Sequence, residues 1–219
     1  MTPDLRLYAL LDPAVAGGRT LADLARAVAE GATIVQLRDK FGTTRGMIDA
    51  ARAIAAELAP KRIPLLINDR LDVALAAGAQ GVHVGWDDMP ADSARRLLGP
   101  DAIIGLSIKT LEEAAAAPLE ALDYVAIGGV HATSSKDNKQ APIGTGGLRA
   151  IAQAIRARKA GFPVCAIAGI TAANAADVIA AGSDGVAVIS ALSLASDPAR
   201  AARDLRGVVD QALQRRGQG

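Results

Sequence analysis

Three polar residues at alternating positions lie in and after a short apolar run near the N-terminus. Gln36, Arg38 and Lys40 belong to or follow the run 33–37. If that run is a β-strand, its period of two places the three side chains on one side. An amide and two cations at a strand end cost desolvation energy unless an anion or another partner meets them. The spacing therefore predicts an anion site, and the alternative is a surface loop with solvated charges.

Carboxylates follow the next two apolar runs of the chain. Asn68 and Asp69 follow one run, and Asp87 and Asp88 come shortly after the other. Mg²⁺ takes one or two carboxylates and completes its shell with water and substrate phosphates. Beside a cluster of Arg and Lys, such acids indicate a metal-bound diphosphate. The alternatives are that Asp69 caps a short helix and that the other two are loop acids near the positive end of the next helix.

Hydroxyl-bearing residues, glycines and one lysine follow the later apolar runs. After the run 123–127 the chain carries paired glycines and then Thr133, Ser134, Ser135 and Lys136. This composition suits a loop that binds oxyanions, although Ser, Thr and Gly are also what solvent loops contain. Ser107 follows another run, where a lone serine is usually a capping or loop residue, and nothing there indicates a nucleophile.

The elements that must position these residues are short strands alternating with Ala-rich helices. We expect strands at 5–11, 33–37, 64–67, 81–84, 102–106, 123–127, 163–167 and 185–188. We expect helices at 20–30, 44–58, 70–77, 91–98, 110–117, 147–160, 172–181 and from 197 onward. Eight strands alternating with eight helices at this length favour an α/β fold, a single-domain (β/α)₈ TIM barrel over residues 1–219, rather than an open sheet. Residues from about 213 to 219 are expected to be a frayed tail.

The barrel gives the strand-end residues a common location. In such barrels the chemistry lies at the C-terminal ends of the strands, and the loops after strands seven and eight commonly bind phosphate. Gly169 follows the seventh strand and Ser190 follows the eighth. The pattern therefore predicts a phosphorylated substrate without saying which one. His83 lies in mid-strand and is interpreted as a hydrogen-bonded structural histidine.

Composition excludes several classes of protein. Lys and Arg number 24 and Asp and Glu number 23, so the net charge of +1 argues against a nucleic-acid partner or a polybasic membrane arm. The single cysteine, Cys165, excludes an internal disulfide framework or a Cys-cluster zinc site. No apolar leader and no stretch of about 18 uncharged apolar residues is visible. We therefore expect a cytoplasmic protein without a membrane partner.

The strand-end motifs, taken in order, resemble the thiamine-phosphate synthase family, also called thiamine phosphate pyrophosphorylases, from Tyr8 to about Ser190. The motifs are Val35-Gln36-Leu37-Arg38-Asp39-Lys40, Ile67-Asn68-Asp69, His83-Val84-Gly85-Trp86-Asp87-Asp88, Gly105-Leu106-Ser107, Thr133-Ser134-Ser135-Lys136, Ala168-Gly169-Ile170-Thr171 and Ile189-Ser190. The family joins hydroxymethylpyrimidine diphosphate to a thiazole phosphate, making thiamine monophosphate and diphosphate. Two small-molecule substrates and Mg²⁺ are therefore implied.

The resemblance also implies a role for each matching residue. The pyrimidine diphosphate would be bound by Gln36, Arg38, Lys40, Asn68, Ser107 and Lys136. Of these, Arg38, Lys40, Ser107 and Lys136 would be catalytic, and Asp69 and Asp88 would bind Mg²⁺. The thiazole phosphate would be bound by Thr133, Ser134, Ser135, Gly169, Ile189 and Ser190.

The chain departs from the family pattern at a few positions, and two alternatives stay open. Trp86 and Asp87 stand where the family usually has Gln and Glu, and His131 precedes the hydroxyl loop where an aromatic residue is common. A thiazole tautomerase of the same fold would not need a full diphosphate and metal set. A non-catalytic binder of thiamine phosphates could lose the metal pair. The sequence leaves open whether the chain forms a homo-oligomer.

Overall fold

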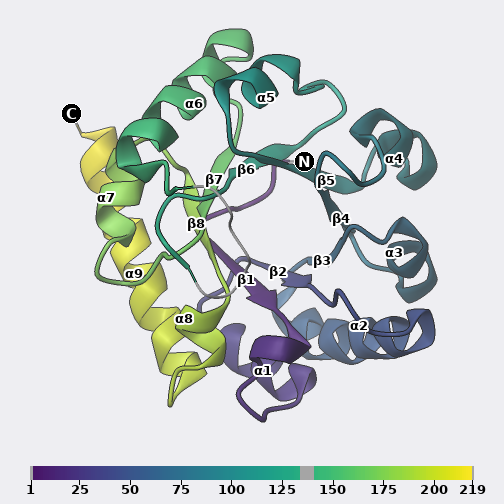
Figure 1. The fold of residues 1–219 in the computed structure, drawn as a ribbon. Coiled ribbons are helices and arrows are strands. Elements are labelled where there is room, and N and C mark those ends of the chain that lie inside the picture. The colour runs from purple at the N-terminus through teal and green to yellow at the C-terminus, as the bar shows by residue number, and fades with distance from the viewer. Residues whose placement is uncertain (1, 134–140, 219) are drawn as a thin grey trace.

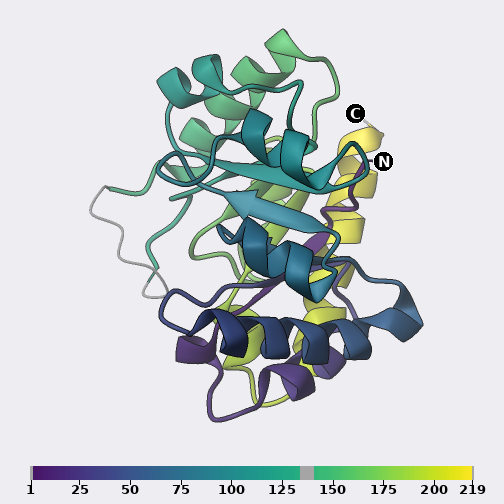
Figure 2. The same ribbon diagram turned by 90° about the vertical axis from the view of Figure 1, so that its right-hand side faces the viewer.

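The fold is a closed barrel of parallel strands enclosed by helices. The computed structural model describes residues 2–133 and 141–218. Within these residues, eight strands pair in chain order, and β8 closes the ring on β1. The strands are β1 Leu7–Leu11, β2 Ile34–Leu37, β3 Leu65–Asn68, β4 Gly81–Val84, β5 Ile103–Ile108, β6 Tyr124–Ile127, β7 Val164–Ile167 and β8 Gly185–Val188. Figure 1 looks down the barrel and Figure 2 shows it from the side.

The helices lie outside the strands (Figure 1). They are α1 Leu21–Val28, α2 Thr44–Leu58, α3 Leu71–Ala77, α4 Ala91–Leu98, α5 Leu111–Ala116, α6 Gly144–Arg158, α7 Ala175–Ala180, α8 Ser190–Ser193 and α9 Pro198–Gly217, with short 3₁₀ turns η1 Pro13–Val15 and η2 Ala59–Lys61. Hydroxyl and carboxyl caps begin several of them; for example, the Thr20 side chain accepts from the Asp23 amide at the start of α1. Nowhere in the described chain is a helix both long and apolar enough to span a membrane.

The predicted (β/α)₈ architecture is confirmed, and among the local differences three are informative. β5 continues to Ile108 because Ser107 and Ile108 still pair with β6. The short helix α8, directly after β8, was not expected. The expectation of a frayed tail from about residue 213 is wrong, since α9 continues to Gly217. Arg216 holds this end by donating to the Ser183 carbonyl at 2.6 Å and by pairing with Asp184 at 2.8 Å.

Two apolar clusters account for the packing. The larger one fills the space between strands and helices. The smaller one fills the interior of the barrel and includes Tyr8, Leu66, Tyr124 and Cys165, all fully buried. Strand alternation explains the division, because successive side chains point inward and outward. The inner cluster forms the floor beneath the C-terminal opening.

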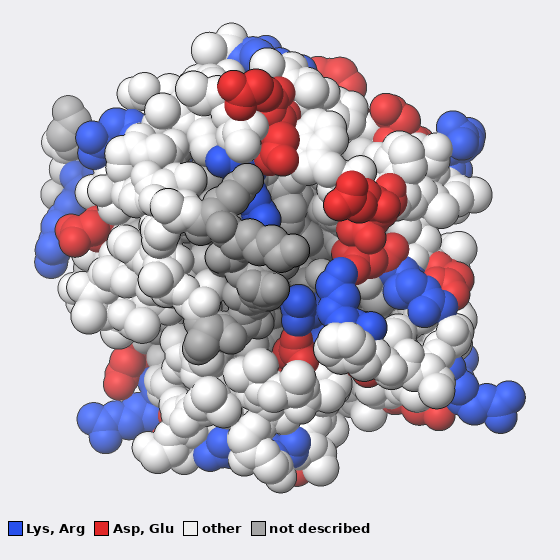
Figure 3. Space-filling model, viewed as in Figure 1, with Lys and Arg blue, Asp and Glu red and all other residues white. Residues whose placement is uncertain are grey.

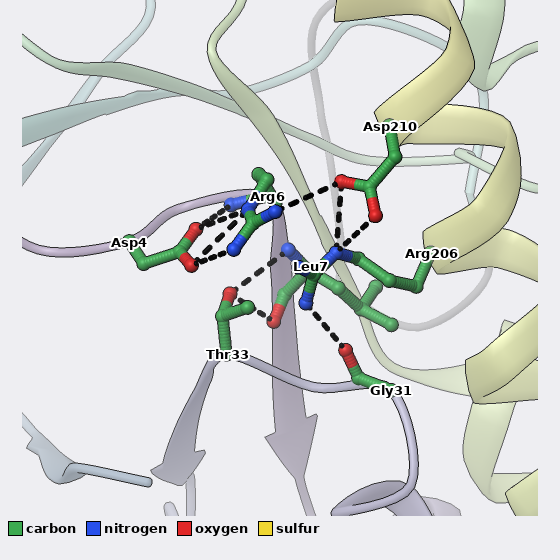
Figure 4. A network of polar contacts seen from close by, with 7 residues as sticks. All are labelled: Asp4, Arg6, Leu7, Gly31, Thr33, Arg206 and Asp210. Atoms are coloured by element: carbon green, nitrogen blue, oxygen red, sulfur yellow. Dashed lines mark hydrogen bonds and ion pairs between the residues drawn. The ribbon is translucent and has the colours of Figure 1, made fainter.

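A hydrogen-bonding device repeats at the N-terminal end of the barrel. The side chain of the residue before each even-numbered strand accepts a hydrogen bond from a backbone amide at or next to the start of the preceding odd-numbered strand. The backbone amide of the same residue donates a hydrogen bond to the carbonyl of the residue whose amide it accepts. The acceptor and amide pairs are Thr33 and Leu7 (3.1 Å), Gln80 and Leu65 (2.8 Å), Asp123 and Ile104 (2.8 Å), and Asp184 and Val164 (3.0 Å). Figure 4 shows the first of these beside the ion pairs of Arg6. These four strand-start amides and their side-chain acceptors are therefore satisfied within the protein.

Candidate active site

A pocket opens at the C-terminal end of the barrel and brings together side chains from most of the strands. Its polar lining comes from Gln36, Arg38, Asn68, His83, Ser107, Lys109, Thr133, Thr171 and Ser190, with Tyr8 at its inner end. Figure 3 shows this face of the molecule, with charged side chains of both signs gathered over β2, β3 and β4. The pocket therefore has a charged side and an opposite side formed by the loops after β6, β7 and β8.

Arg38 is held at the charged side by a carboxylate that the sequence analysis missed. Its guanidinium forms an ion pair with Asp12, which follows β1 and is buried. Asp12 also accepts from the Ala14 amide at 2.9 Å and so caps η1. A fixed guanidinium loses less entropy when it binds a phosphate, because its orientation is already set. Asp12 directly follows β1, so the expectation that functional residues lie at the C-terminal ends of the strands would have found it.

Lys40, Asp69 and Asp88 meet beside this pair and form one charged cluster. Lys40 forms an ion pair with Asp69, and the Asp88 carboxylate lies close enough to Asp69 to interact with it. Burial is the main cause that raises the pKa of Asp69, and Asp88 raises it further against the opposing effect of Lys40. Asp88 also accepts from the Gly85 amide at 2.8 Å, which fixes its position. Two carboxylates with one cation leave room for a second positive charge.

The donor set of this cluster fits Mg²⁺. Within the described parts of the chain, no group of three or more His, Cys, Asp and Glu side chains could enclose a metal. Zinc sites are usually built from such groups, whereas Mg²⁺ commonly takes one or two carboxylates and keeps water and substrate phosphates as its other ligands. Asp69 and Asp88 match the second pattern.

A chain of hydrogen bonds crosses the floor of the pocket. The Gln36 side-chain amide donates to the Tyr8 hydroxyl, which is 2.9 Å from the Tyr124 hydroxyl. Tyr124 is 2.9 Å from His83 Nδ1, and His83 Nε2 is 2.9 Å from the Ser107 hydroxyl. Burial raises the pKa of both tyrosines, so both remain protonated. The interpretation of His83 as a hydrogen-bonded histidine is confirmed, but the two tyrosines were missed because strand residues between apolar neighbours resemble ordinary core.

The opposite side of the pocket is built on close backbone contacts. Gly169 has a φ of +63°, and a Cβ there would lie 2.3 Å from the Ala132 carbonyl oxygen. Ala168 before it also has a positive φ, +96°. Asn174 fixes this turn by accepting from the Thr171 amide at 2.8 Å and donating to the Gly169 carbonyl at 2.9 Å. The missing side chain at Gly169 therefore lets the loop after β6 approach this turn closely.

The predicted site residues divide into three groups. Those that line the one pocket are Gln36, Arg38, Asn68, Ser107, Thr133, Gly169, Ile189 and Ser190. Lys40, Asp69 and Asp88 form the charged cluster next to Asn68 at the end of β3. Ser134, Ser135 and Lys136 lie outside the described residues, so their roles stay predictions.

Comparison with known proteins bears directly on this site. The family model for thiamine monophosphate synthase matches residues 7–192, a span that contains every strand of the barrel. The chain belongs to this family. It is 49% identical to the thiamine-phosphate synthase of Agrobacterium fabrum over 97% of both chains. It is 45% identical to that of Moorella thermoacetica over 96% of this chain and 98% of the other.

Solved structures agree with the family assignment. The thiamine phosphate pyrophosphorylase of Pyrococcus furiosus superposes with a TM-score of 0.83 at 35% identity, covering 96% of this chain and 98% of that one. A 3-hexulose-6-phosphate synthase superposes with a TM-score of 0.64 at 21% identity. The second likeness shows the shared barrel fold alone. Members of the thiamine-phosphate synthase family are enzymes, and the chain is accordingly a transferase.

Proposed function

We propose that the chain condenses 4-amino-2-methyl-5-hydroxymethylpyrimidine diphosphate with 4-methyl-5-(2-phosphoethyl)thiazole, giving thiamine monophosphate and diphosphate. The observation that carries the proposal is the cluster of Lys40, Asp69 and Asp88 beside Arg38, at neighbouring strand ends of a family member. A thiazole tautomerase or a passive binder has no need of this charge arrangement, because neither releases a diphosphate.

The chemistry of the reaction matches the residues available. Diphosphate leaves from a benzyl-like carbon whose cation the aminopyrimidine stabilises, and a thiazole nitrogen without a proton attacks that carbon. The step needs charge neutralisation and orientation rather than a strong base. Arg38 and Lys40 supply positive charge to the leaving oxygens. Mg²⁺ held by Asp69 and Asp88 would supply further positive charge to the same diphosphate.

The second substrate would occupy the other side of the pocket. Thr133, Gly169, Ile189 and Ser190 lie there, at the loops after β6, β7 and β8. Backbone amides and hydroxyls at these loops suit a phosphate that is bound but not transferred. Ser134, Ser135 and Lys136 enter this proposal only through the family resemblance.

The proposal is tested by incubating the purified chain with both substrates and Mg²⁺ and identifying the products by mass spectrometry. We expect thiamine monophosphate and diphosphate in equal amounts, and no thiamine monophosphate when either substrate is omitted. Isomerisation of the thiazole without release of diphosphate would favour the tautomerase. Binding of both compounds without turnover would favour the passive binder.

A further inference from the structure

The buried hydrogen-bond chain beneath the pocket has a direction. It runs from Gln36 on β2 through Tyr8 on β1 and Tyr124 on β6 to His83 on β4 and Ser107 on β5. Each hydroxyl has only one hydrogen to donate, and a neutral imidazole has one donor nitrogen and one acceptor nitrogen. Once the first link is set, therefore, every later link follows.

The first link is set by the Gln36 amide. Its Nε2 donates to Tyr8, so the Tyr8 hydrogen must go to Tyr124. Tyr124 then donates to His83 Nδ1, which leaves the His83 hydrogen on Nε2. His83 Nε2–H donates to the Ser107 oxygen, and the hydrogen of Ser107 itself is left for an acceptor in the pocket.

The Gln36 end of the hydrogen-bond chain offers an acceptor, whereas the Ser107 end offers a donor. Gln36 Oε1 is buried and has no hydrogen-bond partner among the residues that the structure describes. A buried acceptor without a donor is costly, so its place in the pocket lining points to a ligand N–H or O–H. The pocket thus offers an acceptor at Gln36 and a donor at Ser107.

We propose that Tyr8, Tyr124 and His83 are positioning residues that fix the direction of donation along this hydrogen-bond chain. In that direction, Gln36 accepts from the amino group of the pyrimidine and Ser107 donates to the leaving diphosphate. The inference rests on the proposed function. As the diphosphate departs, positive charge grows on the amino group and negative charge grows on the leaving oxygens. An acceptor at the first and a donor at the second both bind more strongly in the transition state.

Packing contacts hold the side chains of this hydrogen-bond chain in place. Gly105 on β5 makes room for Tyr124, because a Cβ there would lie 2.0 Å from the Tyr124 ring. The ring of Tyr124 is stacked on His83 and meets Tyr8 edge to face. These contacts hold the hydroxyls and the imidazole in register.

The direct test is the tautomer of His83, measured by long-range ¹H–¹⁵N correlation on protein labelled at histidine. The chain has two histidines, and a His131→Gln variant assigns the remaining signals to His83. We expect His83 in the ligand-free protein to be neutral, with its proton on Nε2. A proton on Nδ1, or on both nitrogens, would overturn the proposal. The hydrogen-bond chain would then run in the opposite direction or be broken.

A kinetic test uses the 4-amino substrate and its 4-oxo analogue, which presents an acceptor instead of a donor to Gln36. Tyr124→Phe removes the central link, and Cys165→Ala alters the same buried cluster without touching the chain. We expect Tyr124→Phe to lower the ratio of kcat/KM for the two compounds by about tenfold or more, and Cys165→Ala to leave the ratio unchanged. Equal ratios in the two variants would overturn the proposal.

A second variant separates the two ends of the chain. Tyr8→Phe breaks the link between Gln36 and Tyr124, so the ratio should fall and the His83 proton should no longer be confined to Nε2. A His83 tautomer unchanged in Tyr8→Phe would show that Gln36 does not set the direction. This variant also serves if Tyr124→Phe does not fold. Failure of the wild-type protein to make thiamine monophosphate would refute the proposed function, whereas the tautomer, measured without substrate, decides the direction of the chain independently.

Discussion

The two ends of the barrel treat aspartate in opposite ways. At the N-terminal end, Asp123 accepts from Arg95 at 2.6 Å and from the Ile104 amide. Asp184 accepts from the Val164 amide and pairs with Arg156 and Arg216. At the C-terminal end, Asp69 and Asp88 lie together with Lys40 as the cation paired with Asp69. The first pair of acids is saturated by the protein, and the second pair retains capacity for a ligand.

Backbone strain follows this division only in part. Asp69 and Ala168, at the ends of β3 and β7, have positive φ values of +61° and +96°, but Arg62, before β3 at the other end, also has a positive φ of +54°. Such conformations cost about 1–3 kcal/mol for residues other than glycine. The orphaned Gln36 Oε1 lies at the same end. The unpartnered acceptor therefore lies at the end of the barrel that carries the pocket, whereas the repeated hydrogen bonds of the other end supply rigidity.

The largest expected effect is that of Asp69→Asn on catalysis. Loss of one carboxylate from the proposed Mg²⁺ pair should cost about 3 kcal/mol, or roughly a hundredfold in kcat. Burial and Asp88 raise the pKa of Asp69, so the folded state disfavours its ionised form. The resulting loss of stability is complete at pH values above the folded-state pKa. Asparagine lacks that cost and tolerates a positive φ, so the melting temperature at pH 7 should stay equal or rise. A large fall in melting temperature would place Asp69 among the structural acids.

The counterpart at the other end is Asp184→Asn. It keeps an acceptor for the Val164 amide but loses the charge that pairs with two arginines. We expect the free energy of unfolding to fall by about 2 kcal/mol in denaturant titrations, since both arginines can rehydrate partly. Steady-state kinetics well below the melting temperature should be those of the wild type. A loss of kcat matching that of Asp69→Asn would abolish the distinction between the two ends.

Gly169→Ala should affect the thiazole side of the pocket. The added Cβ would meet the Ala132 carbonyl, and a positive φ disfavours alanine by about 1–2 kcal/mol. We therefore expect the KM for the thiazole phosphate to rise by about tenfold, with a smaller change for the pyrimidine diphosphate. Initial rates with each substrate varied in turn separate the two, and an equal rise for both would contradict the division of the pocket. Gly18→Ala is a suitable control, because Gly18 has a positive φ of +79° with open space around it.

The smallest effect is expected for Arg6→Ala at the N-terminal end. Arg6 pairs with Asp4 at 2.6 Å and with Asp210 at 3.3 Å, and all three side chains are partly exposed (Figure 4). Exposed ion pairs contribute about 0.2–1 kcal/mol, so stability should change by no more than that and kinetics should not change. A loss above about 2 kcal/mol would show that this network carries more of the barrel's stability than pairwise contacts predict.

The barrel could be predicted because each helix and strand has a recognisable pattern in its own short segment of sequence. Alternation of apolar runs with capped helices, as at Thr20, and glycines at the joints, as at Gly78, are properties of short segments. The end of α9 was predicted wrongly because Arg216 is held by Ser183 and Asp184, residues more than thirty positions away. Long-range contacts of that kind leave no local signal.

The site was predictable where a residue follows a strand directly. Arg38, Asn68 and Ser190 line the pocket as that rule implies. The rule also reaches Asp12, which was overlooked. It cannot reach Tyr8 and Tyr124, because their role depends on a chain that crosses the barrel through five strands. The sequence did place Asp69 and Asp88 after consecutive strands, and the parallel pairing of β3 with β4 brings those strand ends side by side.

The most direct test of the account is the initial rate of thiamine monophosphate formation against free Mg²⁺, measured for wild type, Asp88→Asn and Asp184→Asn. We predict that wild type and Asp184→Asn give superimposable Mg²⁺ curves, that Asp88→Asn needs at least about tenfold more metal, and that excess chelator abolishes the rate in all three. Undiminished synthesis in excess chelator, or an Mg²⁺ curve for Asp88→Asn identical to that of the wild type, would contradict the assignment of catalysis to the paired acids of the C-terminal end.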